Sequence, residues 1–155
     1  MAKIERKYLA HYISTGDDSF ERLGKDLEEF SPELAAQVDT KKNILGETSI
    51  LISSYEKTGA VEPYYAEKDS GLFQRLQQII DDGLVLDQLK TEVVEVKLWE
   101  QEESGAYPAV KEEAYIEVTS YGGDTTGYQI PFTLHFTGNK VKGSFDVNAK
   151  KFSMA

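Results

Sequence analysis

The sequence of 155 residues contains no cysteine, two histidines and one tryptophan. Without cysteine the chain cannot form disulfides or thiolate metal sites, and it has no cysteine nucleophile, so its stability must come from packing. It also lacks any apolar run near the roughly 18 residues that a membrane-spanning helix needs, and its first residues lack the apolar segment of a signal peptide. We therefore expect a protein that is made in the cytoplasm and has no membrane as a partner.

Patterns that bind metals or perform catalysis are missing too. His11 and His135 lie far apart in the sequence, and neither an H-x-x-x-H spacing nor a carboxylate-rich calcium loop occurs. The nucleophile pattern G-x-S-x-G is also missing. Glu112 and Glu113 could in principle supply a general acid and base, but adjacent residues on a strand point to opposite faces. The sequence therefore predicts no metal site, no cofactor and no enzyme.

Composition predicts a single soluble domain, residues 1–155, with one core. Hydrophobic residues make up 40% of the chain and charged residues 28%, which is typical of a globular protein. The net charge is −10, with basic residues at both ends and an acidic middle. Because the chain is this acidic, it should repel a phosphate backbone, and we do not expect it to bind duplex DNA. The divided charge either favours self-association or keeps a monomer soluble.

One helix is predicted over about residues 70–82, because the apolar residues there recur on one side of a helix. Asp69 or Ser70 can cap its amino end, and Gly83 can end it. Elsewhere the dominant period is two, as in residues 94–98 and 110–118, which is typical of half-buried strands. Less regular strand candidates lie near the start, around residues 20–25 and in the segments bracketing residues 34–57. The chain is therefore expected to be mainly β with a single helix.

The stretch "SYGGDTTGYQIPFTLHFTGNKVKGSFDV" resembles a phosphate-binding loop in its glycines, but a strand pattern and not a helix follows them. We predict instead a β-hairpin whose two-residue turn is Gly138-Asn139, because glycine accepts a positive φ. In this register Phe136 faces Val141 and every large apolar side chain lies on one face. The apolar residues expected to pair across this hairpin include Phe132, Phe136, Val141 and Phe145.

Tyrosine is abundant, with nine copies, and three of them fall in a turn-broken stretch from about residue 43 to residue 69. These are Tyr55, Tyr64 and Tyr65. Long loops inside a compact domain are usually functional or disordered, and tyrosine suits an interface because it has a large apolar body with a polar tip. We predict a functional loop here, and ordinary half-buried packing is the alternative explanation for the tyrosines.

Several segments resemble the major tail tube proteins of tailed bacteriophages. They are "DTKKNILGETSI" (residues 39–50), "VEPYYAEKDSGLFQRLQQIIDD", "AYPAVKEEAYIEVTSYGGDTTGYQIPFTLHFTGNKVKGSFDV" and the closing "AKKF". The resemblance runs from about residue 7 to residue 152, and its most specific part is the block "SYGGDTTGYQIPF...GNKVKGSFDV". None of these motifs is catalytic.

The resemblance implies a fold and a function. The implied fold is two packed antiparallel sheets, sandwich-like or barrel-like, flanked by the one helix. The implied function is structural: hexameric rings of the chain stack into the hollow tail tube of a virion, which conducts DNA to the host without binding it specifically. The implied partners are other copies of the chain and the tape-measure, tail terminator and baseplate proteins. An assembly loop at about residues 43–69 would carry the intersubunit residues Ile44, Leu45, Tyr55, Tyr64 and Tyr65.

Two other readings stay open on the sequence alone. A monomeric ligand-binding β-sandwich, such as a carbohydrate-binding module, would use its tyrosines to stack on sugar rings. A hydrolase with a carboxylate pair would depend on Glu112, and loss of activity in Glu112→Gln would be needed to support it.

Overall fold

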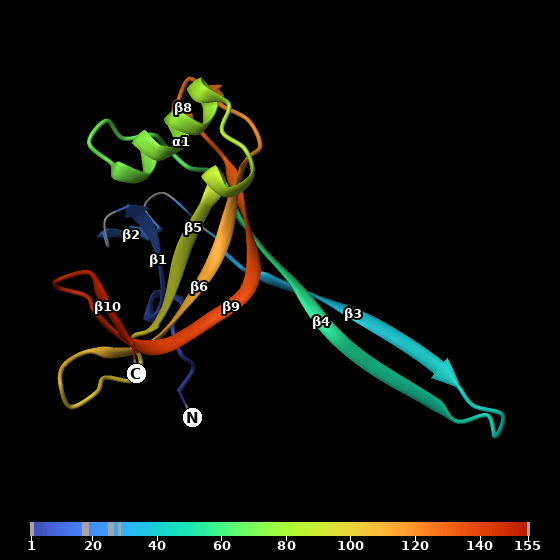
Figure 1. Ribbon diagram of the computed structural model, residues 1–155. Coiled ribbons are helices and arrows are strands. Elements are labelled where there is room, and N and C mark those ends of the chain that lie inside the picture. Colours follow the sequence, from blue (N-terminus) through green and yellow to red (C-terminus); the bar gives the residue numbers. More distant parts are fainter. Residues whose placement is uncertain (1, 17–18, 25–26, 28, 155) are drawn as a thin grey trace.

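The computed structural model describes residues 2–16, 19–24, 27 and 29–154. In these residues the elements follow one another along the chain as a mainly β succession (Figure 1). They are η1 (Arg6–Tyr8), β1 (Leu9–Gly16), β2 (Ser19–Leu23), β3 (Glu33–Lys42), β4 (Thr48–Val61), α1 (Gly71–Asp82), η2 (Leu86–Leu89), β5 (Lys90–Lys97), β6 (Tyr107–Val118), β7 (Gly122–Asp124), β8 (Gly127–Gln129), β9 (Phe132–Asp146) and β10 (Lys151–Met154). None of the helices in the described part is long and apolar enough to cross a membrane.

One eight-stranded antiparallel sheet organises the molecule, with the strand order β2-β1-β5-β6-β9-β4-β3. The long strand β9 divides its outer edge between two partners: β4 pairs with its first residues and β10 with its last. Strands β7 and β8 form a separate two-stranded hairpin. The predicted mainly β class is confirmed, but the expectation of two packed sheets is wrong, because a single curved sheet takes their place.

Apart from β3 and most of β4, the sheet has a hydrophobic core on each face, which explains why it needs no second sheet. Helix α1 covers one face, where Leu72 and Leu76 pack with Phe132. On the other face Tyr12 and Phe145 meet with ring centroids 4.4 Å apart, and Phe20 of the edge strand β2 approaches Phe145 at 5.9 Å. Since β2 and β9 are separated by three strands in the sheet, this contact shows that the sheet curls around its own second core.

Helix α1 forms where the sequence predicted it. The Ser70 hydroxyl accepts a hydrogen bond from the backbone N–H of Phe73, which satisfies one free amide of the first turn. Gly83 ends the helix in the left-handed conformation with a φ of 59°, and its N–H donates to the Ile79 carbonyl. The apolar stripe of the helix is buried against the sheet, so the predicted helix over residues 70–82 is confirmed.

The predicted hairpin at Gly138-Asn139 is wrong, because β9 runs through these residues as one strand. Its neighbour β6 pairs with it on both sides of the bend, and Glu113 alone spans the interval that Thr137, Gly138 and Asn139 occupy on β9. The Thr137 hydroxyl donates to the Glu113 carbonyl at 3.2 Å and accepts from the Asn139 N–H at 3.3 Å. Gly138 does adopt a positive φ, of 90°, but it serves a bulge that bends the strand and not a turn that reverses it.

The expected pairing across that hairpin fails with it. Phe132 pairs with Val118 and belongs to the core under α1, whereas Phe145 pairs with Tyr107 and belongs to the other core. A period of two shows that residues share a face within each segment. It does not show whether two consecutive segments fold back on each other or continue as one bent strand.

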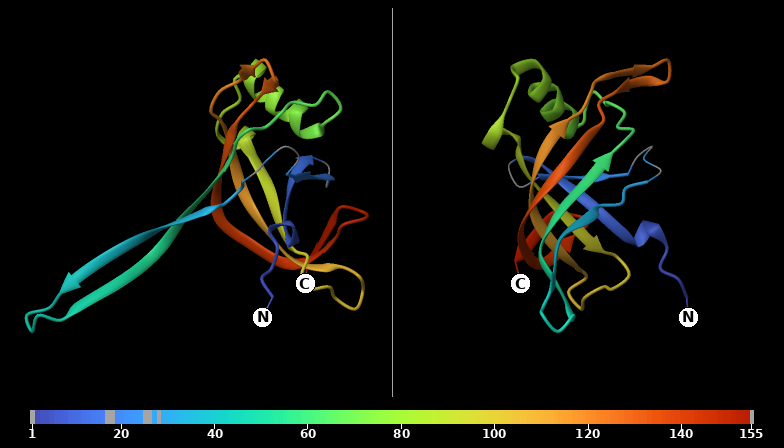
Figure 2. Two further views of the ribbon diagram at one scale, coloured as in Figure 1. Left: turned by 180° about the vertical axis from the view of Figure 1, so that it is seen from behind. Right: turned by 90° about the vertical axis from the view of Figure 1, so that its right-hand side faces the viewer.

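Strands β3 and β4 project from the body of the molecule as a two-stranded arm (Figures 1 and 2). We use "arm" for residues 33–57 and "body" for the rest of the described chain. Strand β4 joins the sheet only through Thr58–Val61, which pair with β9, and its earlier residues pair with β3 alone. The stretch predicted as a long loop, about residues 43–69, therefore begins with a short turn and continues as a strand as far as Val61. The sequence prediction failed here because the apolar run 50–52 followed by two serines breaks the period of two.

Candidate functional site: the projecting arm

The short arm exposes eight large apolar side chains, as many as the rest of the described molecule together. Every one of them is at least 53% accessible, and Ile44 at the tip is fully accessible. So many exposed apolar side chains on one short segment are unusual on a monomer and mark a candidate site of interaction. The exposed apolar residues of the arm are Leu34, Val38, Ile44, Leu45, Ile50, Leu51, Ile52 and Tyr55.

The tip of the arm is a turn closed by hydrogen bonds. The side-chain oxygen of Asn43 accepts hydrogen bonds from the backbone N–H groups of Leu45, at 2.9 Å, and Glu47, at 3.0 Å. The Asn43 N–H in turn donates to the Glu47 carbonyl. These bonds close the turn through one asparagine, so Ile44 and Leu45 are held out in solvent by a defined backbone.

The root of the arm is fixed by a buried ion pair. Lys57 Nζ lies 2.9 Å from Glu112 Oε1 of β6, with the two side chains 15% and 5% accessible. The same ammonium group lies 4.5 Å from the centre of the Phe136 ring. Gly59 also brings the backbone of β4 close to Phe30, since a Cβ at this position would lie 2.9 Å from the Phe30 ring. A buried charge must keep its partner, so this pair ties the arm to β6.

The five predicted intersubunit residues do not form one surface. Ile44, Leu45 and Tyr55 lie on the arm, exposed to solvent. Tyr64 lies in the body, where its ring packs edge-on against Phe132 and its hydroxyl is 3.2 Å from Ser70 Oγ. Burial raises the pKa of Tyr64 to about 12.

Tyr65 also belongs to the body. It forms a β-bridge with Gln129, and its hydroxyl lies 3.3 Å from Thr126 Oγ1. Tyr55 on the arm is therefore separated from Tyr64 and Tyr65 in the body, so the three tyrosines of the predicted loop do not form one surface.

Sequence reasoning missed most of the arm's apolar residues. The predicted intersubunit residues did not include Leu34, Val38 or the run Ile50, Leu51 and Ile52. The available signal was β-propensity: three consecutive apolar residues with two β-branched members favour a strand over a loop.

Glu112 and Glu113, the pair considered as a general acid and base, do not face a common site. Glu112 is engaged with Lys57, whereas Glu113 lies 3.1 Å from Lys90, so the two carboxylates have separate partners. In the part of the chain that the structure describes, no three metal-binding side chains come together. His135 bonds Glu117 at 2.6 Å on the surface.

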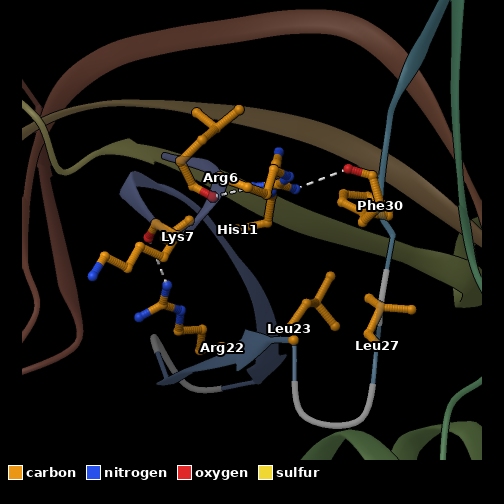
Figure 3. Close-up of a pocket in the computed structure, with 10 residues that line it drawn as sticks. Arg6, Lys7, His11, Arg22, Leu23, Leu27 and Phe30 are labelled. Atoms are coloured by element: carbon orange, nitrogen blue, oxygen red, sulfur yellow. Dashed lines mark hydrogen bonds between the residues drawn. The ribbon is translucent and has the colours of Figure 1, made fainter. Parts of the chain in front are cut away.

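A cavity of about 510 Å³ lies between η1, β1, β2 and the segment that leads to β3 (Figure 3). Arg6 donates to the Phe30 carbonyl at 2.8 Å and also to the carbonyl of Leu9. Arg22 donates to the Lys7 carbonyl at 3.2 Å. Both guanidinium groups thus hold backbone segments together, and their role in this cavity is structural.

The fold defines a class: this chain has the fold of proteins that build tail tubes. The tail tube protein of SPP1 superposes with a TM-score of 0.66 and 16% identity, over 99% of this chain and 81% of that chain. A tail chain of a gene transfer agent particle, determined with C6 symmetry, gives a TM-score of 0.57 and 20% identity, over 89% of this chain and 97% of that one. The tube-terminating cap of the anti-feeding prophage gives a TM-score of 0.56 and 10% identity, over 93% of each of the two chains. No family model and no curated protein matches the sequence.

Proposed function

We propose that this chain is the repeating subunit of a tail tube, a structural protein of a virion or of a particle built like one. The observation that carries the proposal is the arm, whose large apolar side chains are exposed along its whole length in the single chain. The fold supports it, because the similarity to the SPP1 tail tube protein extends over nearly the whole chain. The sequence resemblance to major tail tube proteins points the same way.

Assembly supplies what the single chain lacks. Covering the arm with other copies removes its apolar surface from water, which is the main driving force of association. Among the described residues, strands β2, β3 and β10 each have a partner strand on one side only, and neighbouring copies can pair with such edges. A contact of this kind between different surfaces of identical chains closes into rings or continues as a filament. The C6 symmetry of the gene transfer agent tail leads us to propose rings of six.

The proposed tube conducts DNA without binding it. With a net charge of −10, a lumen lined by this chain would repel phosphates, so that a passing duplex does not adhere. The ends of the tube would meet other tail proteins, and we propose tape-measure, tail terminator and baseplate proteins as these partners.

Electron microscopy of the purified protein tests the proposal. We expect stacked rings or tubes in negative stain, growing with protein concentration. Because one similar structure is a tube-terminating cap, the length distribution separates the two roles: a cap stops at a single ring. A protein that stays monomeric at high concentration, even with its tail partners, would overturn the proposal.

A further inference from the structure

The two faces of the arm differ in chemistry, as its strand pairing shows. Cross-strand partners in an antiparallel pair share a face. On one face Ala36 pairs with Tyr55, Val38 with Ile52 and Thr40 with Ile50. On the other face Ala35 pairs with Glu56, Gln37 with Ser54, Asp39 with Leu51 and Lys41 with Ser49. We call these the apolar face and the polar face of the arm.

A bulge in β4 creates this separation. The register shifts between the pairs Gln37–Ser54 and Val38–Ile52, which leaves Ser53 without a cross-strand partner. In a regular strand Ile52 and Tyr55, three residues apart, would point to opposite faces. The extra residue brings them to the same face, so the bulge gathers the apolar side chains on one side of the arm.

The apolar face continues into a groove on the body. Leu34 and Lys57, the cross-strand pair at the root, line a groove of about 440 Å³ together with Phe136, Val110 and Leu9. Lys140 and Lys142 of β9 also line it, and neither forms an ion pair with a residue that the structure describes. Lys97, Glu95 and Glu112 line the groove as well, and Glu112 is paired with Lys57, so the groove combines apolar side chains with four lysines and two glutamates.

The loop between β5 and β6 has the complementary character. It contains Trp99, which is 43% accessible, together with exposed Glu100 and Glu103, and residues 98–106 include no lysine or arginine. Its backbone is held in shape by hydrogen bonds such as that from the Glu102 N–H to the Ala106 carbonyl at 2.8 Å. The loop lies at the end of the body near the termini and away from the arm (Figure 1).

We propose that the apolar face of the arm and the adjoining groove receive a second copy of this chain, which enters with its Trp99 loop, while the polar face of the arm stays in water. Charge complementarity favours this partner, because a groove with four lysines and two glutamates meets an acidic loop around an exposed tryptophan, a residue enriched in interaction hot spots. The contact joins different surfaces of identical chains, so it propagates from copy to copy. The inference rests on the proposed tube function and names the surfaces that build the tube.

Leu51 and Ile52 provide a matched test. They are adjacent aliphatic residues with nearly equal accessibility, 54% and 55%, but they lie on opposite faces of the arm. We expect Ile52→Lys to remain a folded monomer by circular dichroism and to lose tube formation at least tenfold, measured by sedimentation and negative stain. We expect Leu51→Lys to assemble like the unmodified chain. If Ile52→Lys does not fold, Val38→Lys and its polar-face neighbour Gln37→Lys repeat the comparison.

Trp99 is the only tryptophan in the sequence, so its fluorescence reports the position of the loop. We expect the Trp99 emission to shift to shorter wavelength when the unmodified chain forms tubes. In Ile52→Lys, which we expect to stay monomeric, the emission should not change on dilution. Equal behaviour of the two lysine variants, or an unchanged Trp99 emission in intact tubes, would overturn this inference and leave the tube function standing. Failure of the unmodified chain to form rings or tubes would instead overturn the function.

Discussion

Adjacent apolar residues on a strand are buried in the body and exposed on the arm. Val93 and Val94 are adjacent on β5 and both are buried, because α1 covers one face of the sheet and the curled sheet encloses the other. Leu51 and Ile52 are adjacent on β4 and both are more than half exposed. The body therefore contains both hydrophobic cores of the chain. The arm has its backbone ladder and its anchored root, but its apolar side chains remain exposed in the single chain.

This difference predicts a large contrast in the stability of the single chain. Phe132→Ala and Phe145→Ala, one in each core, should each lower the free energy of unfolding by about 3–5 kcal/mol, because each leaves a cavity. Ile50→Ala on the arm should change it by less than about 0.5 kcal/mol. Urea denaturation of the monomer measures all three. A loss at Ile50 as large as that at the phenylalanines would show that the arm folds back onto the body.

The next largest effect on stability is expected at the root of the arm, where the arm joins the body. Lys57→Met leaves Glu112 as a buried carboxylate without its cation, at a cost of about 3 kcal/mol. Replacing both members, as in Lys57→Met with Glu112→Leu, should recover most of that loss because no unpaired charge remains. Thermal unfolding of the two variants checks this. A double variant no more stable than Lys57→Met would contradict the assignment of the loss to the stranded charge.

The same contrast explains how far the sequence could predict the structure. Helix α1 was predictable because its cap, its apolar stripe and its terminal glycine are local signals. The single curled sheet was not, since burial on two faces depends on contacts such as Phe20 with Phe145, far apart in the sequence. Gly138 carried a true signal, a positive φ, but that φ suits a turn and a bulge alike. The apolar face of the arm depends on the register shift beside Ser53, which no periodicity shows.

High pH should lower the stability of the body by a smaller amount, through ionisation of Tyr64. Burial raises the pKa of Tyr64 from its ordinary value to about 12, so the hydroxyl keeps its proton in the folded chain after the unfolded chain has lost it. The stability that this contributes is complete below pH 10 and is lost as the pH rises from about 10 to 12. Because the ring is only partly buried, we expect the loss to be about 1 kcal/mol. Tyr64→Phe should remove this component from the stability profile between pH 9 and 12, and an unchanged profile would contradict the assignment.

The smallest expected effect concerns Leu86, a residue of the body that resembles the arm in its exposure. Its side chain is 80% accessible and its backbone has a φ of 54°, in the left-handed region that leucine rarely adopts. Leu86→Asn should stabilise the monomer by about 0.5 kcal/mol, because asparagine tolerates this conformation and little apolar burial is lost. Val85→Asn is the matched control, since Val85 is exposed but has an extended backbone with a φ of −141°. Equal melting temperatures for the two variants would show that the conformation at Leu86 stores no strain, and that the body is as relaxed there as elsewhere.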